Sequence, residues 1–164
     1  MKHFFVVRHG SYHSHGREDV LSPLGHEQMM TLGRFIKDIL HGSSAYICSS
    51  PAPRAVQSAQ ILGNALSLPS SSLEEIPYLW SGSDVPNDNP GYAAIFGQKD
   101  LMALVEERKE KADGLIMVTH FEVVRDLPHC FMDQAFQQKV KIPEVGKGQA
   151  VHINLERRTY QIIP

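Results

Sequence analysis

Three short stretches of the chain are apolar at nearly every position and lack the polar alternation of a strand with one face in water. They are Phe4–Val7, Ala45–Cys48 and Leu115–Thr119. Short continuous runs rich in β-branched and aromatic residues are typical of strands covered on both faces, and such strands belong to parallel sheets flanked by helices. The pattern therefore predicts a buried, mostly parallel sheet.

Helical periodicity follows the first two of these stretches. Apolar residues recur at helical spacing across Leu32–Leu40, and Ser22 with Pro23 before them fits an N-cap followed by proline at the first helical position. A second helix is predicted after Ser49-Ser50-Pro51 and through about Leu66. Each of the first two strands is thus followed by a helix, which is the order of an α/β fold.

The second half of the chain continues this order. A third helix is predicted around Leu101–Val105, before the third strand. Another begins after His120, and we expect Pro128 to end or kink it, because proline has no N–H to donate and clashes with the preceding turn.

The remaining segments complete the expected architecture. Residues 67–98 are rich in Ser, Pro, Gly and Asn, so we expect mostly loop with a short strand near Glu75. A loop this long tends to be functional. Residues 150–155 and 159–163 predict an antiparallel hairpin at the sheet edge. We expect one domain over residues 1–164, a three-layer α/β/α sandwich whose sheet is mostly parallel.

Composition excludes several classes of function. The chain has 164 residues, 42% of them hydrophobic, and a net charge of −2, which argues against nucleic acid or an anionic membrane as a partner. No apolar run approaches the ~20 residues of a membrane span, and the first ten residues lack the pattern of a secretory signal, so we expect a cytoplasmic protein. Cys48 and Cys130 form neither a disulfide framework nor a metal site.

Cationic and imidazole side chains follow the predicted strands. Arg8 and His9 come directly after the first strand, Arg54 lies one short turn beyond the second, and His120 follows the third. Open α/β sheets place ligand sites at the carboxyl ends of their strands, so these residues can converge on one pocket. Guanidinium groups bind phosphate oxygens in bidentate fashion, and the helix N-terminus after Ser50 adds positive potential. The sequence therefore predicts a site for a phosphate dianion.

These residues lie in four motifs that together resemble the histidine phosphatase superfamily, also called the phosphoglycerate mutase-like family. The motifs are Val7–Gly10, Leu21–Gly25, Ser49–Ala59 and Val118–His120. The resemblance covers nearly the whole chain. It implies that His9 is the nucleophile, and that Arg8, Arg54 and His120 complete the phosphate pocket.

Phosphoryl transfer to a neutral imidazole gives a phosphohistidine, which water then hydrolyses, and we expect no cofactor for it. Because His9 must be unprotonated to attack, the hypothesis predicts that activity falls as the pH drops below its pKa.

The leaving group needs a proton, and the family pattern points to a carboxylic acid shortly after Leu73. Glu75 is the better aligned candidate, although it could also be a solvated loop residue. The alternatives are other acidic residues in neighbouring segments: Glu74, Asp84, Asp88, Asp19 and Glu18.

Three positions depart from the usual family pattern. His15 stands where many relatives have a phosphate-contacting Asn, and Phe121-Glu122 replaces the common glycine after the second histidine. Phe121 could face the core or stack on a ligand ring, and we favour the core. His13 and His15 lack the further ligands of a recognisable zinc site, so we expect no metal.

The function we expect is hydrolysis of a phosphomonoester or of phosphohistidine, on a phosphorylated protein or a small phosphorylated substrate. Only 65 residues separate Arg54 from His120, too few for the lid insertions of phosphoglycerate mutases. Length and layout resemble the short bacterial phosphohistidine phosphatases of the SixA type. Two alternatives stay open, which are a phosphatase for sugar phosphates or nucleotides and a catalytically idle module that only recognises phosphate.

Overall fold

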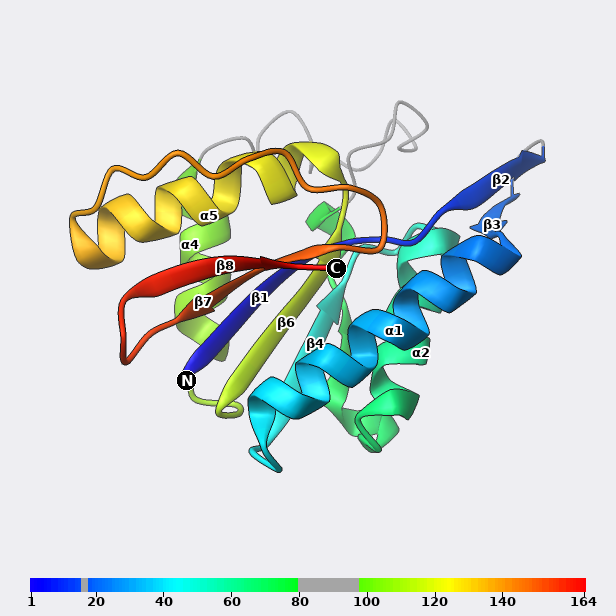
Figure 1. Cartoon of the computed structure of the whole chain (residues 1–164), viewed down its shortest axis with the longest axis horizontal. Helices are drawn as coiled ribbons and strands as arrows, with labels where there is room; N and C mark the ends of the chain where they lie inside the picture. The colour runs from blue at the N-terminus through cyan, green and yellow to red at the C-terminus, as the bar shows by residue number, and fades with distance from the viewer. Residues whose placement is uncertain (16–17, 80–97) are drawn as a thin grey trace.

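A six-stranded sheet in the order β5-β4-β6-β1-β7-β8 forms the centre of the molecule in the computed structural model, which describes residues 1–15, 18–79 and 98–164 (Figure 1). Strands β5, β4, β6 and β1 run parallel, whereas β7 is antiparallel to both of its neighbours. The parallel sheet and the antiparallel edge hairpin are thus confirmed. The strands are β1 (His3–Arg8), β4 (Ala45–Ser49), β5 (Leu73–Glu75), β6 (Gly114–Thr119), β7 (Ala150–Asn154) and β8 (Thr159–Ile163).

Helices cover both faces of this sheet. α1 (Pro23–Leu40) and α2 (Pro53–Ala65) pack on one face, and α4 (Gln98–Arg108) and α5 (Phe121–Phe136) on the other (Figure 1). Side chains alternate across β1, so that Phe5 belongs to the core beside α1 and α2 while Phe4 belongs to the core beside α4 and α5. The continuous apolar run of β1 is explained by these two cores, and the three-layer α/β/α sandwich is confirmed.

The register of the three central strands brings their carboxyl ends to one level. Arg8, the last residue of β1, pairs with Thr119, the last residue of β6, and Ser49 at the end of β4 pairs with Val118. Side chains that directly follow these strands therefore emerge together at one edge of the sheet.

The start of α1 lies directly against the chain that follows His9. Ser22 caps the helix, accepting a 3.1 Å hydrogen bond from the Gly25 N–H, and its own N–H donates to the Ser11 carbonyl. A Cβ atom at Gly25 would lie 2.0 Å from that carbonyl oxygen, so only glycine permits this approach. The cap thereby fixes the backbone next to His9.

Two short strands lie between His9 and α1, in a stretch where the hydrophobic pattern predicted no element. They form an antiparallel pair, β2 (Tyr12–His15) and β3 (Glu18–Leu21), which projects beyond the sheet at the end of β1 (Figure 1). The Leu21 N–H donates to the Gln57 side chain of α2. Because this support comes from α2, the polar composition of the segment gave no sign of the pairing.

The helix after His120 does not end at its proline. α5 continues through Pro128 to Phe136, so of the two effects expected of Pro128, an end or a kink, the structure excludes the end. Proline removes one backbone donor, whereas the buried apolar face that includes Val124, Leu127 and Phe131 holds the helix on the sheet.

The segment between α2 and β6 agrees with its prediction where it is described. Two 3₁₀ turns, Ser70–Ser72 and Pro77–Leu79, flank β5, which is the short strand expected near Glu75. The rest of the predicted loop, residues 80–97, lies outside the described residues.

Candidate active site

Two histidines and a serine meet where the three central strands end. His9 follows β1, His120 follows β6 and Ser50 follows β4, and β6 lies between the other two strands. Backbone hydrogen bonds extend the sheet by one more residue, from the His9 N–H to the Thr119 carbonyl and from the Ser50 N–H to the Val118 carbonyl. The two imidazoles are 4% and 3% exposed, and their ring centroids are 5.1 Å apart.

The guanidinium of Arg54 joins the two imidazoles. Its Nε donates to His9 Nε2 at 3.2 Å, and its Nη2 donates to His120 Nδ1 at 3.3 Å. Arg54 is 9% exposed and lies in the first turn of α2, where the helix N-terminus adds positive potential. A donor group of fixed planar geometry is thus buried between two basic nitrogens.

The remaining partners of the two rings assign their tautomers. His9 Nδ1 lies 2.8 Å from the Gly10 carbonyl, to which it must donate, so the lone pair of His9 is on Nε2. His120 Nε2 donates to Ser50 Oγ at 2.8 Å, which leaves its lone pair on Nδ1. Both lone pairs therefore point toward the guanidinium.

Burial keeps both rings uncharged. Desolvation, together with the positive charges of Arg54, Lys147 and Arg8, lowers the pKa of His9 to about 4. Desolvation, together with the charges of His9, Arg54 and Arg8, lowers the pKa of His120 to about 3. At neutral pH the site therefore holds two neutral imidazoles among cations.

The lowered pKa of His9 predicts a specific dependence of stability on pH. The unfolded chain takes up a proton at this ring near pH 6.5, whereas the folded chain does so only near pH 4, so stability is complete above about 6.5 and falls as the pH drops from there toward 4. Denaturant unfolding at pH 7 and pH 4.5 measures the loss. In the His9→Asn variant the difference between these two pH values should shrink by about 2–3 kcal/mol. An unchanged difference would contradict the lowered pKa.

Arg8 completes the group of four residues that the sequence predicted. Its Nη1 donates to the Val145 carbonyl at 2.9 Å, and its guanidinium carbon lies 4.9 Å from the centre of the Phe121 ring. The Nε atom is buried and has no hydrogen-bond partner among the residues that the structure describes. Phe121 is half-buried beside Arg8 and Arg125, so the expectation that it faces the core is wrong.

Of the alternative acids, Asp19 is brought to Arg54, the guanidinium between the two histidines. Its carboxylate accepts a 2.8 Å hydrogen bond from Arg54 Nη1, from a position on β3. Glu74 is engaged elsewhere, because it accepts hydrogen bonds from Arg108 and from the Tyr46 hydroxyl. The side chain of Glu18 lies outside the described residues. So do the two candidates in the segment 80–97, Asp84 and Asp88.

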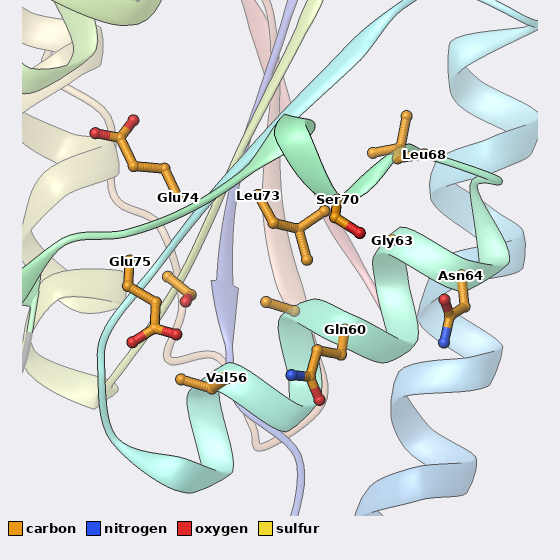
Figure 2. Close-up of a pocket in the computed structure, with 11 residues that line it drawn as sticks. Val56, Gln60, Gly63, Asn64, Leu68, Ser70, Leu73, Glu74 and Glu75 are labelled. Atoms are coloured by element: carbon orange, nitrogen blue, oxygen red, sulfur yellow. The ribbon is translucent and has the colours of Figure 1, made fainter.

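Glu75 ends β5 at the same edge of the sheet, paired with Ser49, but its side chain does not join the hydrogen-bonded cluster. It is exposed and lines a cavity of about 440 Å³ between α2 and β5, together with Val56 and Gln60 (Figure 2). Figure 2 shows its carboxyl group on the opposite side of the strand from that of Glu74, as the alternation along a strand requires.

Sequence reasoning missed two side chains beside the cluster, those of Tyr12 and Lys147. The Tyr12 ring lies 5.3 Å from the His9 ring, between centroids, and 4.8 Å from the Arg54 guanidinium carbon. Lys147 Nζ lies 4.3 Å from the centre of the same Tyr12 ring. The one signal in the sequence was Gly146-Lys147-Gly148, a pattern typical of a tight turn.

In residues 1–15, 18–79 and 98–164, no three or more His, Cys, Asp or Glu side chains are grouped to hold a metal ion. No helix in that part of the chain is both long enough and apolar enough to cross a membrane.

Comparisons with known proteins bear on this site. The model of the histidine phosphatase superfamily (branch 1) matches residues 4–78, which include Arg8, His9 and Arg54. A search of the curated proteins gives no match.

Several solved structures share the fold along nearly the whole chain. The protein histidine phosphatase SixA complexed with tungstate is 18% identical with a TM-score of 0.65, and the alignment covers 99% of this chain and 94% of that one. Ecdysone phosphate phosphatase from Bombix mori, also with tungstate, is 15% identical with a TM-score of 0.72, over 100% and 92% of the two chains. Mycobacterial glucosyl-3-phosphoglycerate phosphatase with VO₃ is 14% identical with a TM-score of 0.63, over 99% and 97%.

The family model begins in β1 and reaches past β5, so it takes in the strand ends that place His9, Ser50 and Arg54. The fold continues over the remainder to β8, including the strand that ends at His120. Residues 4–78 thus resemble the histidine phosphatase superfamily, and the whole chain shares its fold with solved phosphatase structures.

Proposed function

We propose that the chain is a phosphatase that works through a phosphohistidine on His9. The observation that carries the proposal is the arrangement of Arg54, which donates to the lone pairs of two buried, neutral imidazoles. A guanidinium in this position can hold the oxygens of a phosphoryl group next to His9 Nε2. Arg8, whose buried Nε has no partner in residues 1–15, 18–79 and 98–164, supplies a second donor group.

In the first step the lone pair on His9 Nε2 attacks phosphorus. A P–N bond to His9 forms as the bond from phosphorus to the leaving group breaks, a P–O bond in an ester and a P–N bond in a phosphohistidine, and the guanidiniums of Arg8 and Arg54 stabilise charge on the three equatorial oxygens. The hydrogen bond from His9 Nδ1 to the Gly10 carbonyl holds the ring in its reactive tautomer and stabilises the positive charge that develops on it.

In the second step water attacks the same phosphorus and the P–N bond breaks. Orthophosphate leaves, and His9 returns to its neutral form with the lone pair on Nε2. The proton lost by the attacking water goes to the conjugate base of the acid that protonated the leaving group, so both the acid and the nucleophile are restored.

For that acid we propose Glu75, since the Asp19 carboxylate is held by Arg54 and that of Glu74 by Arg108. Glu75→Gln should slow hydrolysis of an alkyl phosphate by about 100-fold, because an alkoxide leaves poorly without a proton. Phosphorylation of His9 by para-nitrophenyl phosphate, whose leaving group is already stable, should change in rate by less than about threefold. Comparing the pre-steady-state rate of this first step for both substrates makes the test, and Glu74→Gln serves as the neighbouring control. An equal loss on both substrates would contradict the role given to Glu75.

For the substrate we propose a phosphorylated protein, with phosphohistidine as the first class to test. The proposal draws on the short spacing between Arg54 and His120 and on the likeness in fold to the SixA protein histidine phosphatase. The fold neighbours also include phosphatases named for small phosphorylated molecules, so a metabolite phosphatase is the second candidate. Comparing kcat/KM for a phosphohistidine-bearing protein with that for a panel of sugar phosphates and nucleotides separates the two.

The idle recognition module stays the alternative outside the enzymes. Binding of inorganic phosphate without turnover of para-nitrophenyl phosphate would favour it over the phosphatase. The cytoplasmic location that the start of the sequence suggested remains a prediction.

A further inference from the structure

The turn that carries Lys147 is attached to the backbone of the proposed nucleophile. The Gly148 N–H lies 3.1 Å from both the Arg8 and the His9 carbonyl oxygens, and the Arg8 N–H donates to the Gln149 carbonyl. Gly148 has a φ of +73°, and a Cβ atom there would lie 2.5 Å from the Gln28 side chain. The position of this turn is therefore fixed on both sides.

The side chain of Lys147 extends from this turn toward the site. Its ammonium lies 4.3 Å from the centre of the Tyr12 ring, which also contacts the His9 ring and the Arg54 guanidinium. The charge of Lys147 helps to lower the pKa of His9, ahead of the contribution of Arg8. Geometry and electrostatics thus both place this lysine beside the proposed nucleophile.

The net charge of the groups around the histidines indicates a role for Lys147. The guanidiniums of Arg8 and Arg54 carry two positive charges, but the ion pair with Asp19 cancels one of them, and both histidines are neutral. A phosphoryl group brings a charge of about −2 at neutral pH. Without Lys147, the one net positive charge of Arg8, Arg54 and Asp19 leaves such an anion only half compensated.

We infer that Lys147 is a further binding residue for the phosphoryl group, supplying the second net positive charge from the turn that is hydrogen-bonded to His9. The inference rests on the proposed function, because it assigns a ligand contact within the same site. Tyr12 holds the ammonium beside the site through a cation–π contact. The long stem of lysine then lets the charge reach the anion when it arrives.

The test measures binding of inorganic phosphate by calorimetry, alongside kcat/KM for para-nitrophenyl phosphate. Lys147→Met should raise the Kd for phosphate about tenfold, the scale expected for one partly exposed charge close to a dianion, and Lys147→Arg should keep it within about threefold. Lys141→Met is the matched control, since this exposed lysine lies in the same connection between α5 and β7, and its Kd should equal that of the unaltered protein. Thermal unfolding of each variant shows that the fold is retained.

The outcomes separate this inference from the proposed function. If His9 becomes phosphorylated in the unaltered protein but Lys147→Met binds phosphate as tightly as Lys141→Met does, the inference is wrong and the phosphatase stands. If phosphate binding weakens selectively in Lys147→Met while no phosphohistidine forms, Lys147 is confirmed as a binding residue and the catalytic proposal fails. A chain that does not bind phosphate at all would overturn the inference.

Discussion

Replacing His9 with alanine is expected to lower kcat for para-nitrophenyl phosphate by about 10⁴-fold or more, because the covalent route loses the atom that attacks phosphorus. Binding of phosphate should survive better than turnover, since Arg8 and Arg54 remain. Initial rates and phosphate binding, measured on the same preparation, give the comparison.

The matched control is His26→Ala, which removes an exposed imidazole from α1 and should leave the rate unchanged. A His9→Ala variant that keeps more than a tenth of the activity would show that another group is the nucleophile, or that water attacks the ester directly.

Replacing Arg54 with lysine is expected to lower kcat/KM by about 10³-fold although the charge is kept. The guanidinium uses three nitrogens at once, on His9, His120 and Asp19, and a lysine ammonium cannot reproduce that planar fork. Loss of the fork should affect both binding and the orientation of His9. We therefore expect KM to rise and kcat to fall.

Arg34→Lys on the exposed face of α1 is the control for this change and should have no effect on either constant. Activity of Arg54→Lys within about threefold of the unaltered chain would contradict a role for the planar guanidinium, since the charge alone would then suffice.

The strands and most helix starts could be predicted because local signals and tertiary packing agree there. Phe4–Val7 is apolar throughout, and the sheet indeed covers both of its faces. Ser22-Pro23 carries its own cap, and α1 starts there. The continuation of α5 past Pro128 could not be predicted, because the buried face of the helix opposes the local effect of the proline and no pattern at the proline itself reveals that face. The pairing of β2 with β3 depends in the same way on support from α2.

The candidate site also contains both residues whose position could be predicted from the sequence and residues whose position could not. His9 and His120 directly follow strands and Arg54 opens a helix, so the topology of an α/β sheet brings them together and the sequence was enough. Lys147 lies in a connection without regular structure, and backbone hydrogen bonds to Arg8 and His9 place it. Glu75 lies at the edge of the sheet where β4 ends, paired with Ser49. The direction of its side chain depends on the pleat of β5, which a motif alone does not fix.

The central claim is that phosphorus becomes bonded to His9 Nε2 during turnover. The most direct measurement mixes the chain rapidly with para-nitrophenyl phosphate, quenches in alkali to preserve the acid-labile P–N bond, and locates the phosphoryl group by mass spectrometry of the fragments. The account predicts a phosphoryl group on His9 that forms and decays at rates compatible with kcat and is missing from His9→Ala. Steady turnover with His9 unmodified throughout, or with the label on another residue, would contradict it.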